Sequence, residues 1–166
     1  MKLYISYGTQ HYLENLPEAA LDHSVLLESS GDAVLIAELD GNNPFKEGHA
    51  YEILNSRGEL KDGSFAVLNH IQVTDEGRSL FEERFKQRAG LVEQEPGFAA
   101  IRVLRPEENH PYIVMTLWKS QSDFTSWQQS DAYAETHKNR GTGQGLPQTL
   151  FSGPSFVKEY NVVSKS

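Results

Sequence analysis

Three side chains in the second half of the chain have the chemistry to hold and act on a bound ligand: Asn69, Trp127 and His137. A neutral imidazole is the commonest protein ligand of a metal ion. A carboxamide can hydrogen-bond charge that develops on a ligand, and an indole offers a large, rigid apolar surface. Groups of these three kinds favour a ligand site if the fold brings them together.

Asn69 lies in the run FAVLNHIQV, residues 65–73, which we predict to be a strand. Alternation along a strand places it on one face with four apolar side chains, Phe65, Val67, Ile71 and Val73. An unpaired buried amide costs about 1–3 kcal/mol. Asn69 therefore needs a partner, which is either another protein group or a ligand.

The elements of the second half alternate in a recognisable order. Thr74 is a predicted N-cap followed by acidic residues, and Ser120 to Asp123 is a capping-box pattern, so each position predicts the start of a helix. The predicted elements are a strand over 65–73, a helix over 74–89, strands over 98–105 and 112–118, a helix from 120 through 127, and a strand over 155–163. This order predicts an α+β, ferredoxin-like (βαββαβ) unit.

Trp127 and His137 could not line one small pocket from a single straight helix, because ten residues advance about 15 Å. Ser130 or Asp131 can cap a fresh helix between them. We therefore expect the helix to break there, so that the two rings converge. A Gly-rich segment, 138–147, follows His137, and long loops of this kind in compact domains are often functional.

The first half has a different composition. Short runs at 2–7, 24–28, 33–39 and 50–54 have the β-branched and aromatic enrichment of strands. The polar stretch 55–64 contains two glycines and predicts a connection. We therefore divide the chain into a β-rich N-terminal region, 1–60, which packs on the sheet, and a ferredoxin-like unit, 65–163.

Composition excludes several classes of protein. The chain has 166 residues, no cysteine and a net charge of −8, so disulfides and thiolate metal sites are impossible and a general nucleic-acid partner is disfavoured. No apolar run approaches 18 residues and the N-terminus lacks a signal peptide, so no membrane partner is expected. The expected location is the cytoplasm.

The segment TLWKSQSDFTSWQQSDAYAETHK, residues 116–138, resembles the matching stretch of the IsdG-type heme-degrading monooxygenases, members of the antibiotic biosynthesis monooxygenase (ABM) superfamily. The resemblance covers roughly 65–163 and includes the family's Trp and His as Trp127 and His137, and its first-strand Asn as Asn69. It implies that His137 is the axial ligand of heme iron, that Asn69 hydrogen-bonds dioxygen on the opposite side, and that Trp127 presses on the porphyrin. Heme would be substrate and oxygen activator, with O2 and an external electron donor, such as a reductase or small reductant, as co-reactants.

Simpler interpretations exist for each residue alone. His137 could stabilise a helix C-terminus, Trp127 could be core, and Asn69 could be a satisfied core amide. His70 is predicted to face away from Asn69, and the charges at 82–86 are expected to form a solvated helix face. The other histidines, His11, His23, His49 and His110, have no ligand-like spacing.

Two alternative functions use the same architecture. One is an ABM oxygenase that acts on an aromatic or quinol substrate without heme, and the other is a non-catalytic signalling protein. The conjunction of Asn69, Trp127 and His137 favours the heme enzyme over both.

IsdG-type enzymes are typically dimers whose sheets pair into a barrel. A fused β-rich N-terminal half could cover the helix-free sheet face within one chain, which would otherwise expose a large apolar patch. We therefore expect a monomer built as a pseudo-dimer.

Overall fold

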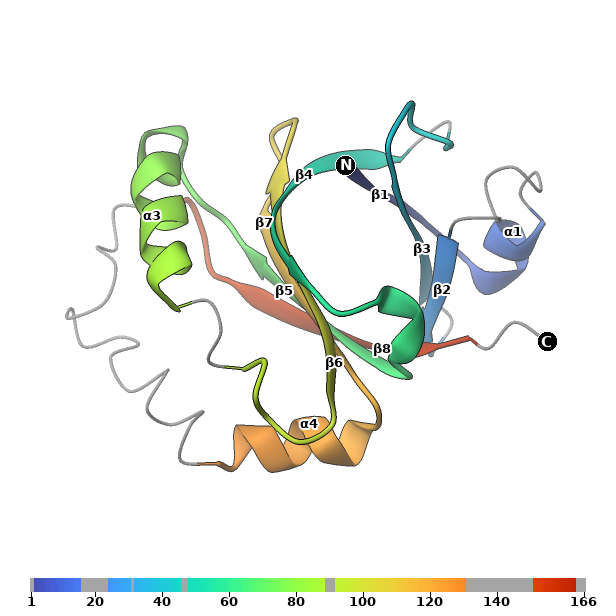
Figure 1. Cartoon of the computed structure of the whole chain (residues 1–166). Helices are drawn as coiled ribbons and strands as arrows, with labels where there is room; N and C mark the ends of the chain where they lie inside the picture. The colour runs from blue at the N-terminus through green and yellow to red at the C-terminus, as the bar shows by residue number, and fades with distance from the viewer. Residues whose placement is uncertain are drawn as a thin grey trace.

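The structure is a computed structural model that describes residues 2–15, 24–30, 32–45, 48–88, 92–130 and 151–163. Within these residues the strands close into one barrel with helices outside it (Figure 1). The strands are β1 (Lys2–Gly8), β2 (Ser24–Ser29), β3 (Asp32–Leu39), β4 (His49–Arg57), β5 (Phe65–Ile71), β6 (Phe98–Pro106), β7 (Tyr112–Trp118) and β8 (Phe156–Val162). The helices are α1 (Gln10–Glu14), α3 (Arg78–Arg88) and α4 (Gln121–Gln128).

The two halves of the barrel have the same strand order. The second half runs β5-α3-β6-β7-α4-β8 along the chain, and its strands lie side by side as β8-β5-β7-β6, the ferredoxin-like arrangement. In the first half the strands lie side by side as β4-β1-β3-β2. When the strands are numbered within each half, both halves therefore have the same spatial order: fourth, first, third, second. The expected α+β ferredoxin-like fold is confirmed for the second half, and strands dominate the whole molecule.

Two seams join the halves, and every pairing in the barrel is antiparallel. At one seam β2 pairs with β8, where Leu27 lies opposite Val162. At the other seam β4 pairs with β6 from Tyr51 to Arg57, with a register shift between Ile53 and Asn55. The closed ring leaves no unpaired sheet edge among these strands.

Alternate residues of each strand fill the barrel interior, as strand geometry requires. The interior cluster contains Ile5 and Ile36 from the first half and Leu68, Leu104 and Met115 from the second, each no more than 2% exposed. Residues of both halves therefore share one core. Leu60, in a 3₁₀ turn after β4, is also in this cluster.

Arg102 is a buried charge at one end of this interior. It is 3% exposed, and its Nε lies 2.5 Å from Glu38 Oε2 on β3. Its remaining N–H groups donate to Glu38 Oε1 and to the carbonyls of Arg57, Gly58 and Ile101, at 2.8–3.2 Å. Every donor of this guanidinium is thus used, which is the condition for burying it.

Gly58 makes the turn that presents one of these carbonyls. Its φ is +74°, and an added Cβ would lie 2.0 Å from the Ala99 carbonyl oxygen. Only glycine combines this backbone conformation with so close an approach. The turn thus fixes how β4 leaves the barrel beside Arg102.

The outer face of the first half is closed by local apolar side chains. Leu13 of α1 is 0% exposed and packs with Tyr4, Leu35 and Phe45. Thr9 caps α1 by accepting a hydrogen bond from the Tyr12 N–H. No helix in the described part of the chain is long and apolar enough to cross a membrane.

The predicted connection over 55–64 is partly wrong. Residues 55–57 continue β4, because the register shift after Ile53 lets the strand keep pairing with β6. Leu60 is buried in the 3₁₀ turn. The 65–73 strand, in turn, ends at Ile71, and Val73 makes an isolated bridge to Phe151.

Candidate functional site

The helix-covered side of β5 carries two separate apolar clusters. Phe65 and Val67 pack with Trp118 and Phe124. Further along the strand, Ile71 packs in a second cluster with two aromatic side chains, Phe81 of α3 and Tyr112 of β7. Asn69 lies between Val67 and Ile71 on this same side, as alternation predicts.

Asn69 is half-buried, and its immediate neighbours on the adjoining strands are both valines. It pairs in register with Val114 of β7 and Val157 of β8. Its Oδ1 is buried and has no hydrogen-bond partner among the described residues. Val157 is 53% exposed, an unusual state for a large apolar side chain beside a sheet core. This position therefore combines an unsatisfied amide with uncovered apolar surface.

Trp127 is placed over the same side of the sheet by α4. Ser120 begins that helix, and its side chain accepts a hydrogen bond from the Asp123 N–H, as predicted. The Trp127 ring lies 5.4 Å from the Trp118 ring and 6.1 Å from the Phe124 ring. Trp127 is thus half-buried in the cluster that contains Val67, next along this face to Asn69.

The helix ends where a break was expected. Its last residue is Gln128, and Ser130 donates through both its N–H and its hydroxyl to the Trp127 carbonyl. The second helix expected after this break, with Asp131 and His137, lies outside the described residues. The structure therefore brings Asn69 and Trp127 to one face, and His137 stays a prediction.

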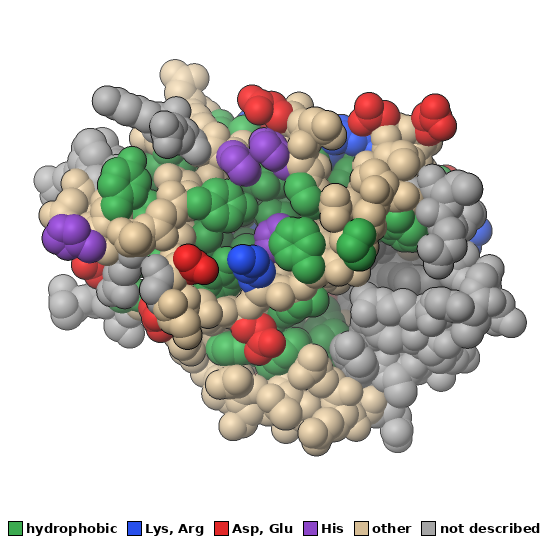
Figure 2. All heavy atoms as spheres, turned by 180° about the vertical axis from the view of Figure 1, so that it is seen from behind, with side chains coloured by type: hydrophobic (Ala, Val, Ile, Leu, Met, Phe, Trp, Pro, Cys, Tyr) green, Lys and Arg blue, Asp and Glu red, His purple; other side chains and the backbone are tan. Residues whose placement is uncertain are grey.

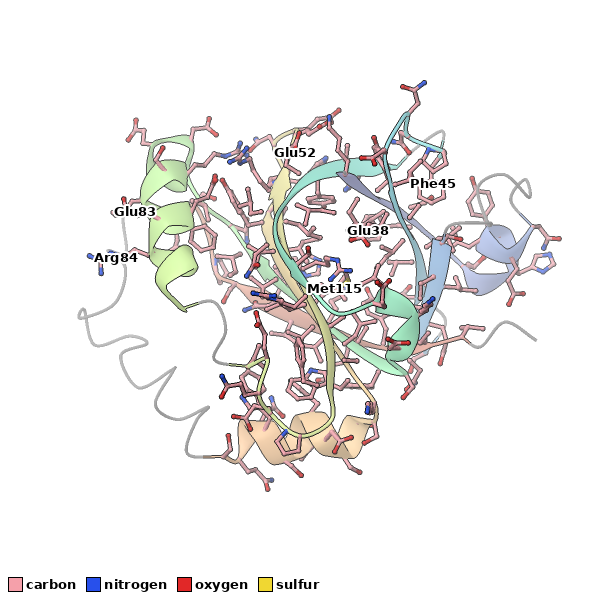
Figure 3. All side chains as sticks on the ribbon, in the orientation of Figure 1. Glu38, Phe45, Glu52, Glu83, Arg84 and Met115 are labelled. Carbon is pink, nitrogen blue, oxygen red and sulfur yellow. The ribbon has the colours of Figure 1, made fainter. Side chains whose placement is uncertain are left out.

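The other helix on this face, α3, is fixed by an ion pair. Glu82 accepts hydrogen bonds from Arg105, the shortest at 2.6 Å from Nη2, and from the Tyr112 hydroxyl. Burial opposes ionisation of Glu82, but the hydrogen bonds from Arg105 and Tyr112 outweigh it and lower the pKa of this carboxyl. Glu82 is therefore no part of a solvated face, which corrects the prediction, whereas Glu83 and Arg84 are exposed and point away from the sheet (Figure 3).

A second group of candidate residues lies on the opposite, barrel-facing side and was not predicted as a site. The His49 and His110 rings stack at 3.9 Å, and both line a pocket with His70. His70 faces away from Asn69, as expected. These histidines lie at the start of β4, near the end of β5 and in the turn between β6 and β7, and their sequence spacing does not show that they meet.

The sequence of the helix-covered half matches a known family. Residues 64–139 match the family model described as "Antibiotic biosynthesis monooxygenase". The matched residues begin at β5 and fall in the half of the chain that has the ferredoxin-like strand order.

Relatives of known name extend the similarity beyond this half. A heme-degrading monooxygenase of Listeria monocytogenes is 26% identical over 130 residues, 78% of each chain. The signal transduction protein TRAP of Staphylococcus epidermidis is 23% identical over 145 residues, 87% of each chain. A solved structure described as a major regulator of staphylococcal pathogenesis has a TM-score of 0.82 at 23% identity, over 99% of this chain and 100% of the other, and shows the shared fold.

Proposed function

We propose that this chain is a heme-degrading monooxygenase of the IsdG type, similar in its two-part layout to the protein called HmoB. Heme would be the substrate, opened at a meso carbon with O2 and electrons from an external donor, and the products would be iron and a bilin-type tetrapyrrole. The observation that supports this most directly is Asn69, an amide in an otherwise apolar setting whose buried Oδ1 accepts no hydrogen bond from a described residue, so that no such bond through Oδ1 fixes which way the amide N–H points.

The residues present suit a heme in three ways. The face around Asn69 is apolar, and Val157 is exposed beside it, as a site for a large flat apolar ring requires. An unsatisfied amide is costly unless a ligand pairs with it. His137 offers an imidazole, the common protein ligand of heme iron.

Each residue would have a separate task. His137 would hold the iron through a ring nitrogen. Asn69 would donate a side-chain N–H into the apolar site and stabilise charge that develops there, which is preorganised electrostatics. Trp127, braced by Trp118 and Phe124, would press on the edge of the porphyrin. Heme itself supplies the iron chemistry that activates O2.

A hemin titration tests the proposal. The purified full chain should develop a Soret band that saturates near one hemin per chain, and His137→Ala should abolish the band. His11→Ala is the matched control, because His11 is exposed on α1 and far along the chain from the site. His70→Phe is a second control, since it removes a histidine of the barrel-facing pocket.

Turnover is measured separately from binding. Addition of reductant in air should bleach the Soret band of the wild type and release iron to a chelator. Asn69→Leu should bind hemin and bleach at least tenfold more slowly, a typical cost of losing one preorganised hydrogen bond. Absence of a Soret band, or a stable band that never bleaches, would contradict the enzymatic proposal and favour the signalling or heme-independent alternatives.

We also infer that the protein works as a monomer, with the N-terminal half in place of a partner subunit. The shared strand order of the halves and the closure of the ring within one chain support this. Analytical ultracentrifugation at micromolar concentration should give the mass of one chain, and a tight dimer would contradict it. The division into 1–60 and 65–163 follows the same logic and stays a prediction.

A further inference from the structure

A pocket of about 500 Å³ opens at one end of the barrel, on the other side of the sheet from Asn69. It lies where β1 ends and where β3, β4 and β8 begin, and we call it the barrel-mouth pocket. Figure 2 shows histidine, basic and hydrophobic side chains gathered on this face of the molecule. Asn69 and His70 are consecutive residues of β5 that point to opposite sides, so this pocket is separate from the proposed heme site.

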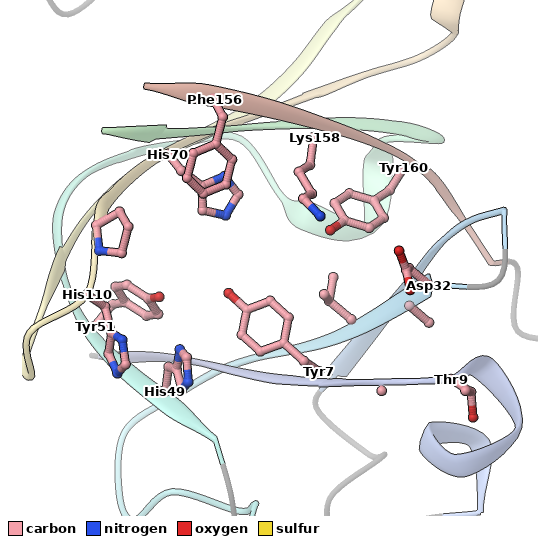
Figure 4. A pocket seen from close by; sticks show the side chains of 14 residues that line it. Tyr7, Thr9, Asp32, His49, Tyr51, His70, His110, Phe156, Lys158 and Tyr160 are labelled. Carbon is pink, nitrogen blue, oxygen red and sulfur yellow. The ribbon is translucent and has the colours of Figure 1, made fainter. Parts of the chain in front are cut away.

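Flat rings form much of its wall. The His70 and Phe156 rings stack at 4.5 Å with an interplanar angle of 7°. Across the pocket, the centroids of the Tyr7 and His49 rings lie 5.1 Å apart (Figure 4). Tyr7 and Phe156 are 41% and 42% exposed, so their ring faces stay open to a ligand. Open aromatic faces of this kind favour a planar aromatic guest.

The pocket also contains an unsatisfied polar atom. His70 is 6% exposed, and its Nδ1 is buried without a well-formed hydrogen bond to a described residue; the backbone of Leu68 and Phe156 lies near the ring and only partly offsets its burial. Burial lowers the pKa of His70 and of His49, so both imidazoles are neutral at pH 7. A buried ring nitrogen without a full hydrogen bond destabilises the folded state. A ligand hydroxyl that reaches Nδ1 would remove this cost.

Lys158 is the only lysine or arginine among the described residues that line the pocket. It makes no ion pair with a described residue, and its ammonium points into the pocket beside Tyr160 (Figure 4). Its strand partner is Leu68, two residues before His70, so Lys158 and His70 are displaced by about 7 Å along the sheet. That separation suits the two ends of a single substituted benzene ring.

Asp32 limits the charge of the guest. It lines the same pocket near Tyr160, where its charge, after burial and Tyr7, helps to raise the pKa of Tyr160 to about 12. The Lys158 ammonium can pair with one carboxylate, and the Asp32 carboxylate repels a second negative charge on the guest. Two further lining groups, Tyr7 and Tyr51, share a hydrogen bond with each other and are neutral.

We propose that the barrel-mouth pocket is a second ligand site, which binds a small monoanionic aromatic acid with a hydroxyl group on its ring. The carboxylate pairs with Lys158, the ring lies against Phe156 and Tyr7, and the hydroxyl donates to His70 Nδ1.

Calorimetric titration of the full chain with a set of probes tests this. 4-Hydroxybenzoate should bind more tightly than benzoate, and both more tightly than 4-hydroxybenzyl alcohol and cyclohexanecarboxylate. Lys158→Gln should weaken the binding of 4-hydroxybenzoate at least tenfold. Lys119 is an exposed lysine outside the pocket, so Lys119→Gln should leave this affinity unchanged. His70→Phe should remove the preference for 4-hydroxybenzoate over benzoate.

Phe156→Ala is a second test in case His70→Phe does not fold, because Phe156 is exposed at the rim of the pocket. Phe156→Ala should weaken the binding of every aromatic probe severalfold. Equal affinity for cyclohexanecarboxylate, no effect of Lys158→Gln, or no binding at millimolar concentration would each overturn the proposal. The hemin Soret titration of Lys158→Gln should match the wild type, so this test is independent of the heme activity.

Discussion

The two halves of the barrel share a strand order but differ on their outer faces. In the first half a short helix closes the face with Leu13, which is completely buried among apolar neighbours. In the second half the longer helices α3 and α4 leave Asn69 between two apolar clusters, with its Oδ1 unpaired among the described residues. One face is thus completed by the chain itself, and the other has the features of a surface completed by a ligand.

The largest effect is expected where the halves meet. Arg102→Met should destabilise the protein by about 3–5 kcal/mol, because the half-buried Glu38 and three backbone carbonyls lose the buried guanidinium that pairs with them. Adding Glu38→Leu should restore most of that loss. Urea unfolding measures both, with Lys2→Met at an exposed ion pair as a control that should cost far less stability. A small effect of Arg102→Met alone would show that the halves do not depend on this contact.

The closed face of the first half should respond to a cavity. Leu13→Ala should cost about 2–5 kcal/mol in the same unfolding assay, since Leu13 is 0% exposed. Its neighbour Tyr12 is 52% exposed on the same helix, and Tyr12→Ala should change stability by less than about 0.5 kcal/mol. Equal effects would mean that α1 does not complete this face.

The open face of the second half should respond in the opposite direction. Asn69→Leu should stabilise the ligand-free protein by about 1 kcal/mol, because it removes an unsatisfied buried amide. Asn161→Leu is the control: this amide is exposed on β8 and donates to Glu28 at 3.3 Å, so its loss should not stabilise. Destabilisation by Asn69→Leu in a thermal melt would show that the amide has a structural partner.

The smallest effect concerns the attachment of α3. Folding lowers the pKa of Glu82, so the ionised carboxylate stabilises the folded protein. This contribution to the free energy of unfolding is complete above the unfolded pKa of 4.5 and is lost as the pH falls through the lower, folded pKa. Glu82→Gln should cost about 1 kcal/mol at pH 7 and flatten the stability profile below pH 4.5. Glu83→Gln, on the exposed side of the same helix, should leave both unchanged. An unaltered acid profile in Glu82→Gln would contradict the assignment.

Local patterns predicted local features well. Strand alternation correctly separated Asn69 from His70, and the capping residues Thr74 and Ser120 correctly marked helix starts, because each signal involves residues close in sequence. The role of Glu82 was missed because its partner Arg105 lies on another element. Amphipathic position alone does not reveal a distant counter-charge.

Long-range pairing could not be predicted. The order of the first four strands, and the seams that β2 and β4 make with β8 and β6, depend on partners far along the chain. The barrel-mouth pocket has the same origin, since His49, His70 and His110 meet only after the ring closes. Individually, each of these histidines has no spacing that marks a site.

Closure of the ring within one polypeptide has a consequence for how this molecule can change over time. In a symmetric dimer, any substitution is duplicated, so both outer surfaces must tolerate it. Here a substitution alters one surface only. The outer surface of one half can therefore keep a purely structural role while that of the other half adapts to a ligand. Because both halves belong to one chain, dilution cannot separate them.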